Sequence, residues 1–343
     1  MTDLSTSYLG LTLRNPVVAS ASPLSQDADG VRRLADAGVG AVVLASLMEE
    51  RVREQEVEDF LDTAVHEDTF GEALTYFPEQ ALGRSDGVTR YLEVVERASA
   101  AVDVPVIASL NGATTGGWTQ IAERLEAAGA AAIELNVYAV PGDIGQPGAR
   151  VEEQHVEIVQ AVRQAVSVPV AVKLSPFFSN TGAMAAALVG AGADGLVLFN
   201  RFLQPDIDTY TVSTQPSTYL SRPEDGRLPR TWIAMLRHRL PQTSFALTTG
   251  VWSADDVVKA LLAGADVVMT ASALLEEGLH VVDELLEGTR AWMSAKGALE
   301  LSDLRGLLAV PVDVDAGGRA RSGYVSALDL ARSSWAGVGP VGG

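Results

Sequence analysis

Polar side chains stand at the ends of short apolar runs along this chain, and Lys173 is the most informative of them. It lies inside the run VPVAVKLS (168–175). An ammonium group in an apolar strand needs a carboxylate or an anionic ligand beside it, or it must lose its proton. Three interpretations stay open: an ion pair with Glu134 on the preceding run, a Schiff-base lysine, and a cation that faces the developing negative charge of a cofactor.

Similar polar positions follow the other apolar runs. They are Ser20, Ser46, Asn111, Asn136, Asn200, Thr249 with Gly250, and Ser272. The asparagines can hydrogen-bond a planar heterocycle. The segments TTGVWSADD (248–256) and TASALLEEG (270–278) place small residues just before a helix start, where barrel enzymes commonly bind phosphate. Together these residues predict a phosphorylated aromatic cofactor at the strand ends, and FMN fits best.

Eight apolar runs must carry these residues. They are 16–22, 41–46, 104–110, 131–137, 168–175, 195–201, 245–250 and 267–272. Most are continuously apolar, as is typical of parallel strands covered on both faces. Amphipathic helical stretches lie between them, and Ala-Gly pairs precede four of the runs, where the glycine suits a left-handed helix end.

The alternation predicts an α/β fold, a single-domain (β/α)8 TIM barrel, with long loops after strands 2 and 6. The barrel is expected over residues 1–310, and residues 311–343 are expected to form a linker and a short helix packed on it. A doubly wound open sheet is the rival fold. It normally carries a glycine-rich dinucleotide turn after its first strand, and ASASPLS (19–25) is not such a turn.

The composition of the chain excludes several classes of partner and of functional site. The 343 residues carry a net charge of −19, which disfavours nucleic acid as a partner. The absence of cysteine excludes disulfides, thiolate metal sites, cysteine-ligated iron–sulfur clusters and a cysteine nucleophile. The four histidines are scattered, so no metal site is expected. Neither a signal peptide nor a run of about 18 apolar residues is evident, so we expect a cytoplasmic protein without a membrane segment.

The chain resembles the dihydroorotate dehydrogenase family, nearest to its dihydroorotate dehydrogenase-like FMN proteins. LRNPVVAS (13–20), VKLSPFF (172–178), GADGLVLFN (192–200) and the segments TTGV and TASALLEEG carry the resemblance, in an order that covers residues 9 to about 278. It implies flavin contacts for Ala19, Ser20, Asn111, Asn136 and Asn200, with Lys173 at the N1/O2 edge of the ring. It further implies that Gly250, Val251, Ala271 and Ser272 hold the phosphate, and that Asn136 and Asn200 also contact the substrate.

Several positions depart from the family pattern. Ala139 stands where the family presents a cysteine or serine base, and Ala45 replaces a lysine at the end of strand 2. SRPEDGRLPR (221–230) occupies the place of a glycine-rich phosphate segment, and LTYFPE (74–79) that of an asparagine-rich substrate loop. Substitute bases are Tyr138, Ser175 and Tyr76, and Tyr76 is also a candidate substrate contact. Tyr138 has the best position of the three, although the ordinary pKa of a phenol, about 10, makes it a weak base at neutral pH. Alternatively, Tyr138 packs against the loop.

The function expected from these residues is an FMN-dependent oxidoreductase of the dihydroorotate dehydrogenase type, acting on a CH–CH bond of dihydroorotate or a related small cyclic substrate. Hydride would pass to flavin N5, and Lys173, Asn136 and Tyr138 would be the catalytic residues. Two alternatives remain: a flavin-free lyase or aldolase that uses Lys173, and a flavin-binding subunit with little activity alone. A homodimer and a redox partner protein are further expectations.

Overall fold

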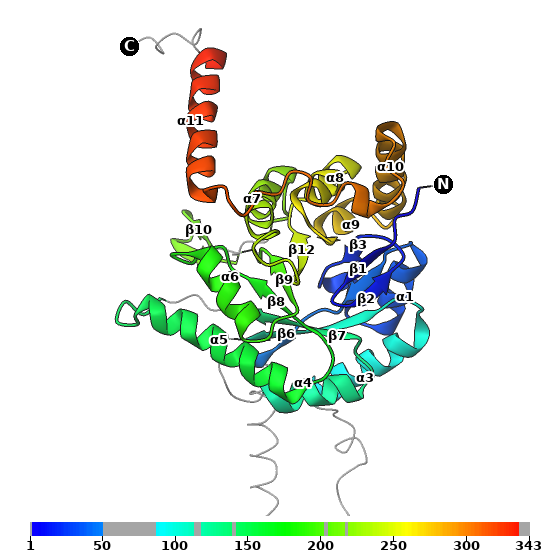
Figure 1. Ribbon diagram of the computed structural model, residues 1–343. Helices are drawn as coiled ribbons and strands as arrows, with labels where there is room; N and C mark the ends of the chain where they lie inside the picture. Colours follow the sequence, from blue (N-terminus) through cyan, green and yellow to red (C-terminus); the bar gives the residue numbers. More distant parts are fainter. Residues whose placement is uncertain are drawn as a thin grey trace, which may run out of the picture.

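Parallel strands form a closed barrel at the centre of the protein. The computed structural model describes residues 2–50, 87–112, 118–138, 142–201, 205–216 and 219–335. The barrel strands are β3 (Val17–Ala19), β4 (Ala41–Val43), β6 (Val106–Gly112), β7 (Ala132–Val137), β8 (Val170–Leu174), β9 (Gly195–Leu198), β12 (Ser244–Thr248) and β13 (Val267–Thr270). Each pairs in parallel with its neighbours, and the β13–β3 and β4–β6 pairings close the ring. The predicted (β/α)8 barrel is confirmed (Figure 1).

A hairpin of β1 (Thr6–Tyr8) and β2 (Leu11–Leu13) closes one end of the barrel. Tyr8, Leu9 and Leu13 pack against the inward side chains of the strands, such as Val18 and Ala246. The Leu9 amide donates to Ser244 Oγ at the beginning of β12. The hairpin therefore plugs the end at which the strands begin and leaves the opposite end for a binding site.

Helices surround the barrel, as Figure 1 shows. They are α1 (Ala28–Asp36), α3 (Gly87–Ala101), α4 (Trp118–Ala127), α5 (Gly148–Ala165), α6 (Thr181–Gly190), α7 (Arg227–Leu236), α8 (Ala254–Ala263) and α10 (Val281–Lys296). A left-handed glycine follows four of them just before a barrel strand, at Gly38, Gly129, Gly192 and Gly264, with φ of 103°, 95°, 105° and 116°. The glycines of the four Ala-Gly pairs thus have the conformation that the sequence predicted for them.

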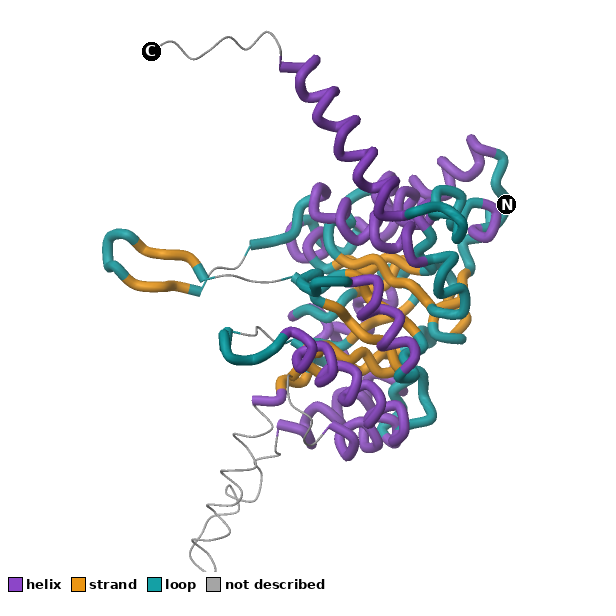
Figure 2. The backbone as a smooth tube through the Cα atoms, turned by 60° about the vertical axis from the view of Figure 1, so that its left-hand side comes forward, coloured by secondary structure: helices purple, strands orange, loops and turns teal. Residues whose placement is uncertain are grey.

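Short elements lie in the connections around the barrel. They are the 3-10 helices η1 (Pro23–Ser25), η4 (Pro223–Gly226) and η5 (Leu301–Asp303), the short helix α9 (Ser272–Glu276), and the two-residue strand β5 (Leu47–Met48) that pairs with β6. The long connection after strand 2 falls largely at 51–86, outside the described residues. The one after strand 6 carries the antiparallel hairpin β10 (Asp206–Asp208) and β11 (Ser213–Gln215), which projects from the barrel in Figure 2.

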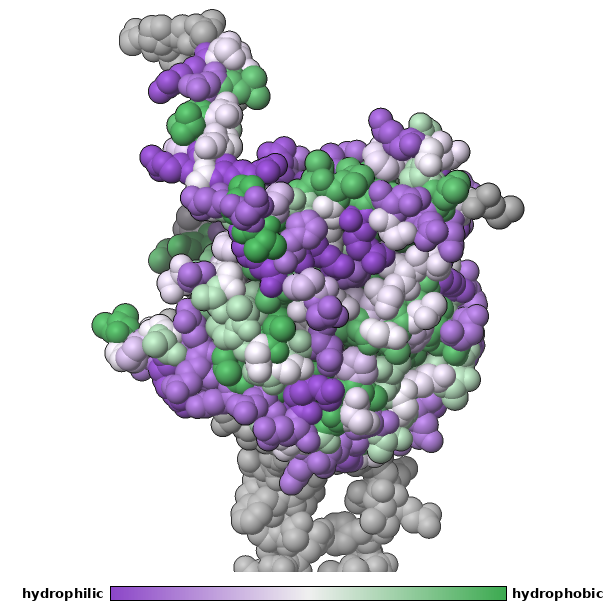
Figure 3. All heavy atoms as spheres, viewed as in Figure 1, coloured by the Kyte–Doolittle hydropathy of each residue, from purple (hydrophilic) through white to green (hydrophobic). Residues whose placement is uncertain are grey.

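The C-terminal segment differs from its prediction. The expected short helix is the 20-residue α11 (Ala316–Trp335), and residues 319–330 are all exposed. It extends away from the barrel in Figures 1 and 2, and in Figure 3 hydrophobic side chains on it face solvent. Arg239 Nη2 holds the preceding linker through the carbonyl of Val314 at 2.8 Å. The linker contacts the barrel and the helix does not pack on it, because its apolar residues are spread among arginines and serines. Within the described residues, no helix is long and apolar enough to cross a membrane.

Candidate active site

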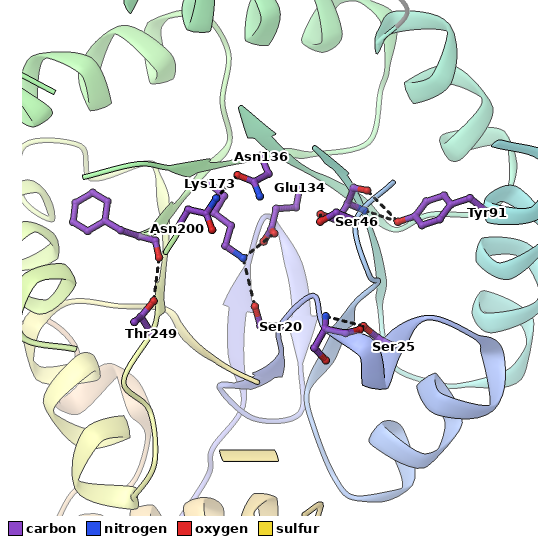
Figure 4. A network of polar contacts seen from close by, with 12 residues as sticks. Ser20, Ser25, Ser46, Tyr91, Glu134, Asn136, Lys173, Asn200 and Thr249 are labelled. Carbon is purple, nitrogen blue, oxygen red and sulfur yellow. Dashed lines mark hydrogen bonds and ion pairs between the residues drawn. The ribbon is translucent and has the colours of Figure 1, made fainter. Parts of the chain in front are cut away.

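Lys173 lies at the end of β8 and points into the barrel mouth. Its Nζ is 3.3 Å from Glu134 Oε1 and 3.5 Å from Ser20 Oγ, as Figure 4 shows. The side chains of Lys173 and Glu134 are only 9% and 1% exposed. The interpretation of Lys173 as the ion-pair partner of Glu134 is therefore confirmed, and the pair compensates a charge that would be costly to bury alone.

The carboxylate of Glu134 is only partly satisfied. Its Oε2 is buried and has no hydrogen-bond partner in the described part of the chain, and neither has the phenol oxygen of Tyr8 in the barrel interior. Burial raises the pKa of Tyr8 well above its usual value, and the charge of Glu134 raises it further. Tyr8 is consequently a neutral phenol, and Lys173 supplies the compensating charge for Glu134.

Two asparagines meet beside the lysine. Asn200 Nδ2 donates to Asn136 Oδ1 at 2.8 Å, and the Asn200 amide donates to the carbonyl of Leu174 at 2.7 Å. Asn136 stands opposite Lys173 in the β7–β8 register, and Asn111 stands opposite Asn136 in the β6–β7 register. Consecutive strand ends thus place the three predicted amides and the cation in one row across the barrel mouth.

A strained turn follows β12. Thr249 and Gly250 have φ of 82° and 74°. A left-handed non-glycine residue costs about 1–3 kcal/mol and is retained where its surroundings hold it. The Thr249 hydroxyl donates to the carbonyl of Phe199 at 3.1 Å, which ties this turn to the end of β9 (Figure 4).

Hydroxyl groups and glycine backbone gather at the ends of β12 and β13. Ser221 Oγ is 2.8 Å from Ser272 Oγ and accepts from the Gly250 amide at 3.3 Å. A side chain on Gly250 would place its Cβ 2.4 Å from the Gly226 amide nitrogen. The segment SRPEDGRLPR, which departs from the family pattern in sequence, therefore packs against the strand ends where the phosphate was expected.

A cavity of about 420 Å³ joins these two regions; we call it the mouth cavity. Its lining includes eight of the predicted site residues, namely Ser20, Lys173, Asn200, Thr249, Gly250, Val251, Ala271 and Ser272. Lys173 of the ion pair and Ser221 and Ser272 of the hydroxyl cluster all line it. The cavity therefore offers a cation and hydroxyl groups in one space, and its size is in the usual range for cofactor sites of about 300–1,000 Å³.

Other predicted residues lie elsewhere. The side chain of Ala19 packs into the core between barrel and helices and does not line the mouth cavity. Ser46 Oγ is 2.8 Å from Ser109 Oγ, and the Tyr91 phenol donates to the Ser109 carbonyl and accepts from the Ser109 amide (Figure 4). Burial raises the pKa of Tyr91. Ser46 thus has a structural partner in the barrel wall.

The predicted bases are spread over the mouth. Tyr138 is partly exposed just after β7, and its amide donates to the carbonyl of Gly112 at 3.1 Å. Ser175 Oγ accepts from the Phe177 amide at 3.2 Å. Tyr76 and Ala139 lie outside the described residues. Among the described residues, no group of acidic or histidine side chains could hold a metal ion.

Sequence reasoning missed several residues of the mouth cavity, and Ser221 and Arg201 are the two whose polar groups matter most for binding. Both belong to the long connection after strand 6, whose path the sequence does not reveal. Arg201 could have been found from the sequence, because it directly follows Asn200, which was already a predicted site residue. Ser221 had no comparable signal, because a serine in a long polar loop is unremarkable in type.

The chain matches known proteins along most of its length. The family model described as dihydroorotate dehydrogenase matches residues 3–293. A dihydroorotate dehydrogenase B (NAD(+)), catalytic subunit, of Methanothermobacter thermautotrophicus is 29% identical over 89% of this chain and 98% of its own length. The protein of the same name in Listeria monocytogenes is 31% identical over 59% of this chain and 68% of its own.

The similarity extends to relatives whose names give fumarate in place of NAD(+). A dihydroorotate dehydrogenase A (fumarate) of Lactobacillus helveticus is 29% identical over 60% of this chain and 67% of its own length. The family match covers the barrel strands and the residues that line the mouth cavity. The chain belongs to the dihydroorotate dehydrogenase family of oxidoreductase enzymes.

Proposed function

We propose that this protein binds FMN in the mouth cavity and oxidises or reduces a CH–CH bond of dihydroorotate or a related small cyclic substrate. The observation that carries the proposal is the mouth cavity itself, which is lined by the buried cation of Lys173 and by the hydroxyl groups of Ser221 and Ser272. A ring that gains negative charge on reduction suits the cation, and a phosphate suits the hydroxyl groups.

The residues present fit this cofactor. Ser221, Gly250 and Ser272 would hold the phosphate, because their hydroxyl and amide groups lie together without a carboxylate among them. Lys173 and Asn200 would contact the ring. FMN, when bound, supplies the hydride acceptor of the reaction.

The chain contributes charge, orientation and exclusion of water. Lys173 would stabilise negative charge at the ring edge, because in a buried site a cation acts through a low dielectric. The bond between Asn200 and Asn136 fixes both amides, so either can orient a ring substrate without first losing conformational freedom. The plug of Tyr8, Leu9 and Leu13 closes the barrel below this site to water.

The absorption spectrum of the purified protein tests the cofactor. We expect flavin bands that disappear on anaerobic addition of dihydroorotate, and stoichiometric FMN uptake by protein stripped of cofactor. Ser272→Ala should weaken FMN uptake about tenfold, since a hydrogen bond to a charged group contributes about 1.5–3 kcal/mol. A colourless protein that takes up no FMN would contradict the proposal. Flavin bands that dihydroorotate leaves unchanged would point to a related cyclic substrate.

Tyr138 is the proposed proton-transfer residue. If its phenol removes the substrate proton, Tyr138→Phe slows flavin reduction at least about tenfold, which is within the usual contribution of general base catalysis. Anaerobic single-turnover reduction measures this rate, and Ser175→Ala serves as the comparison. An unchanged rate in Tyr138→Phe would remove the phenol from the mechanism.

The ion pair disfavours the Schiff-base alternative, because an amine engaged with the carboxylate of Glu134 is not free to attack a carbonyl group. Borohydride in the presence of substrate should therefore leave Lys173 unmodified. A redox partner protein is supported by relatives that are named catalytic subunits. A homodimer is supported by apolar side chains on projecting elements, such as Tyr210 and Val212 near the tip of the β10–β11 hairpin, which are 95% and 85% exposed.

A further inference from the structure

A second cavity lies beside the mouth cavity. Its volume is about 370 Å³, and we call it the side cavity. The two cavities share Phe199, Asn200, Arg201, Tyr219 and Thr249. The side cavity therefore opens next to the amide of Asn200, where the proposed function places substrate and cofactor. The proposed function assigns no part of the cofactor to it.

Arg201 stands on the boundary between the two cavities. Its guanidinium carbon lies 4.6 Å from the centre of the Tyr219 ring, so the ring face holds the guanidinium in place. Its Nη2 is buried and has no hydrogen-bond partner among the described residues. A buried N–H group of a cation that stays unsatisfied destabilises the fold, so an arginine fixed in this way is prepared for an acceptor that comes from outside the chain.

The walls of the side cavity indicate the class of ligand. Pro176, Phe199 and Pro229 provide apolar surface, and the remaining charged groups, Glu224, Asp225 and Arg227, are exposed at its rim. The carboxylates at the rim disfavour a ligand with several negative charges. A planar guanidinium beside apolar surface matches a single carboxylate on a small ring or chain, because it can donate two parallel hydrogen bonds to it.

We propose that Arg201 binds the carboxylate of the substrate and that the side cavity holds the carboxylate end of that molecule. The inference rests on the proposed function for the place of the reaction, and what it adds is Arg201 as a residue that determines specificity, outside the amides at the strand ends. The hydroxyl groups of Ser221 and Ser272 are the proposed phosphate ligands, so Arg201 is left available to the substrate.

Matched ligand pairs test the assignment by calorimetry on the full-length protein. Orotate is compared with uracil, and benzoate with benzamide, so that each pair differs by the carboxylate. We expect at least one carboxylate to bind the wild type at least tenfold more tightly than its neutral counterpart, and Arg201→Gln to abolish that preference. Arg201→Lys should keep part of it, since the ammonium retains charge but not the paired donors. Arg290→Gln on the exposed face of α10 removes the same charge and should keep the preference.

Each outcome decides the proposal. Equal binding of both members of each pair by the wild type overturns it, whatever the fold of the variants. An Arg201→Gln variant that keeps the preference also overturns it. If Arg201→Gln instead loses FMN and regains carboxylate preference when FMN is added in excess, Arg201 binds the cofactor phosphate and the proposal is wrong. Preference that depends on Arg201 in a protein that takes up no FMN would support the carboxylate site while contradicting the proposed function.

Discussion

Lys173 and Glu134 show at the residue scale how one buried pair serves both stability and chemistry. Glu134 is 1% exposed, and the ammonium of Lys173 lies 3.3 Å from its Oε1. A carboxylate so placed depends on its cation, since water cannot reach it. The same cation lines the mouth cavity, so a change at either residue affects the fold and the proposed cofactor site together.

A double-mutant cycle separates the two effects. Lys173→Met should lower the free energy of unfolding by about 3–5 kcal/mol, because it leaves a buried carboxylate unpaired. Adding Glu134→Gln should recover more than half of that loss, since no charge then remains. Urea unfolding of the two single variants and the double variant measures the coupling. Strictly additive effects would show that the pair contributes no interaction of its own.

At the scale of elements, the loops after β9, β12 and β13 build the site jointly. Ser221 from the first loop meets Gly250 from the second and Ser272 from the third. Gly226 backbone lies against Gly250 so closely that a Cβ on either would approach backbone atoms at 3.3 Å or less. The spacing of the proposed phosphate end therefore depends on backbone packing as much as on side chains.

Gly250→Ala tests this packing. The new Cβ would lie 2.4 Å from the Gly226 nitrogen at a φ of 74°, so the loop must move. We expect a loss of about 1–3 kcal/mol in unfolding free energy and at least tenfold weaker FMN uptake. Gly148→Ala is the matched control, because nothing lies within 4 Å of its added Cβ. Normal FMN uptake by Gly250→Ala would exclude this loop from the cofactor site.

His155 makes the packing of α5 dependent on pH. It is 4% exposed, its Nδ1 is 2.7 Å from the carbonyl of Val151, and its ring meets Phe178 edge to face. Burial lowers its pKa below the ordinary value of 6.5 in the folded protein. The unfolded chain therefore binds a proton at His155 more readily than the folded chain does. The contribution of the neutral imidazole to the free energy of unfolding is complete above the unfolded pKa of about 6.5 and decreases as pH falls below it.

Thermal unfolding between pH 7.5 and pH 5 measures this dependence. His155→Gln should show a smaller decrease in Tm over the interval than the wild type. His238→Gln, at an exposed position, should follow the wild type. An identical decrease in all three proteins would show that His155 does not control the acid side of the stability curve.

At the scale of the whole molecule, the barrel is one body with an appended helix. Leu301 and Leu304 of the segment after α10 are 1% and 2% exposed, so the core continues well beyond the last strand. Beyond Val314 the described chain is largely exposed. The core of the enzyme therefore ends before α11, and we propose that residues 1–310 are the folding unit.

Truncation tests this boundary. A chain that ends at Asp315 should keep its Tm within about 2 °C, because exposed residues contribute little to stability. A chain that ends at Glu300 should lose far more, since it lacks the buried Leu301 and Leu304. A large loss of Tm in the first truncation would mean that α11 packs on the barrel or on a second copy, and size-exclusion chromatography distinguishes these outcomes.

The sequence by itself determined the barrel and the row of groups at its mouth. Continuous apolar runs with glycine-ended helices between them specify parallel strands, and parallel strands bring their ends together whatever the loops do. Lys173, Asn136, Asn200, Gly250 and Ser272 could be identified for that reason. The pairing of Lys173 with Glu134 was also accessible, because the two residues lie on consecutive runs.

Only the tertiary structure decided which groups the long connections bring to that mouth. Ser221 and Arg201 reach the cavities through a loop whose course depends on packing against η4, Gly250 and Tyr219, and no periodicity encodes such contacts. The burial of one guanidinium nitrogen without a partner is likewise a property of the folded chain. Strand ends are fixed by local pattern, whereas loop contacts arise from long-range packing, and the contacts proposed for Ser221 and Arg201 depend on the latter.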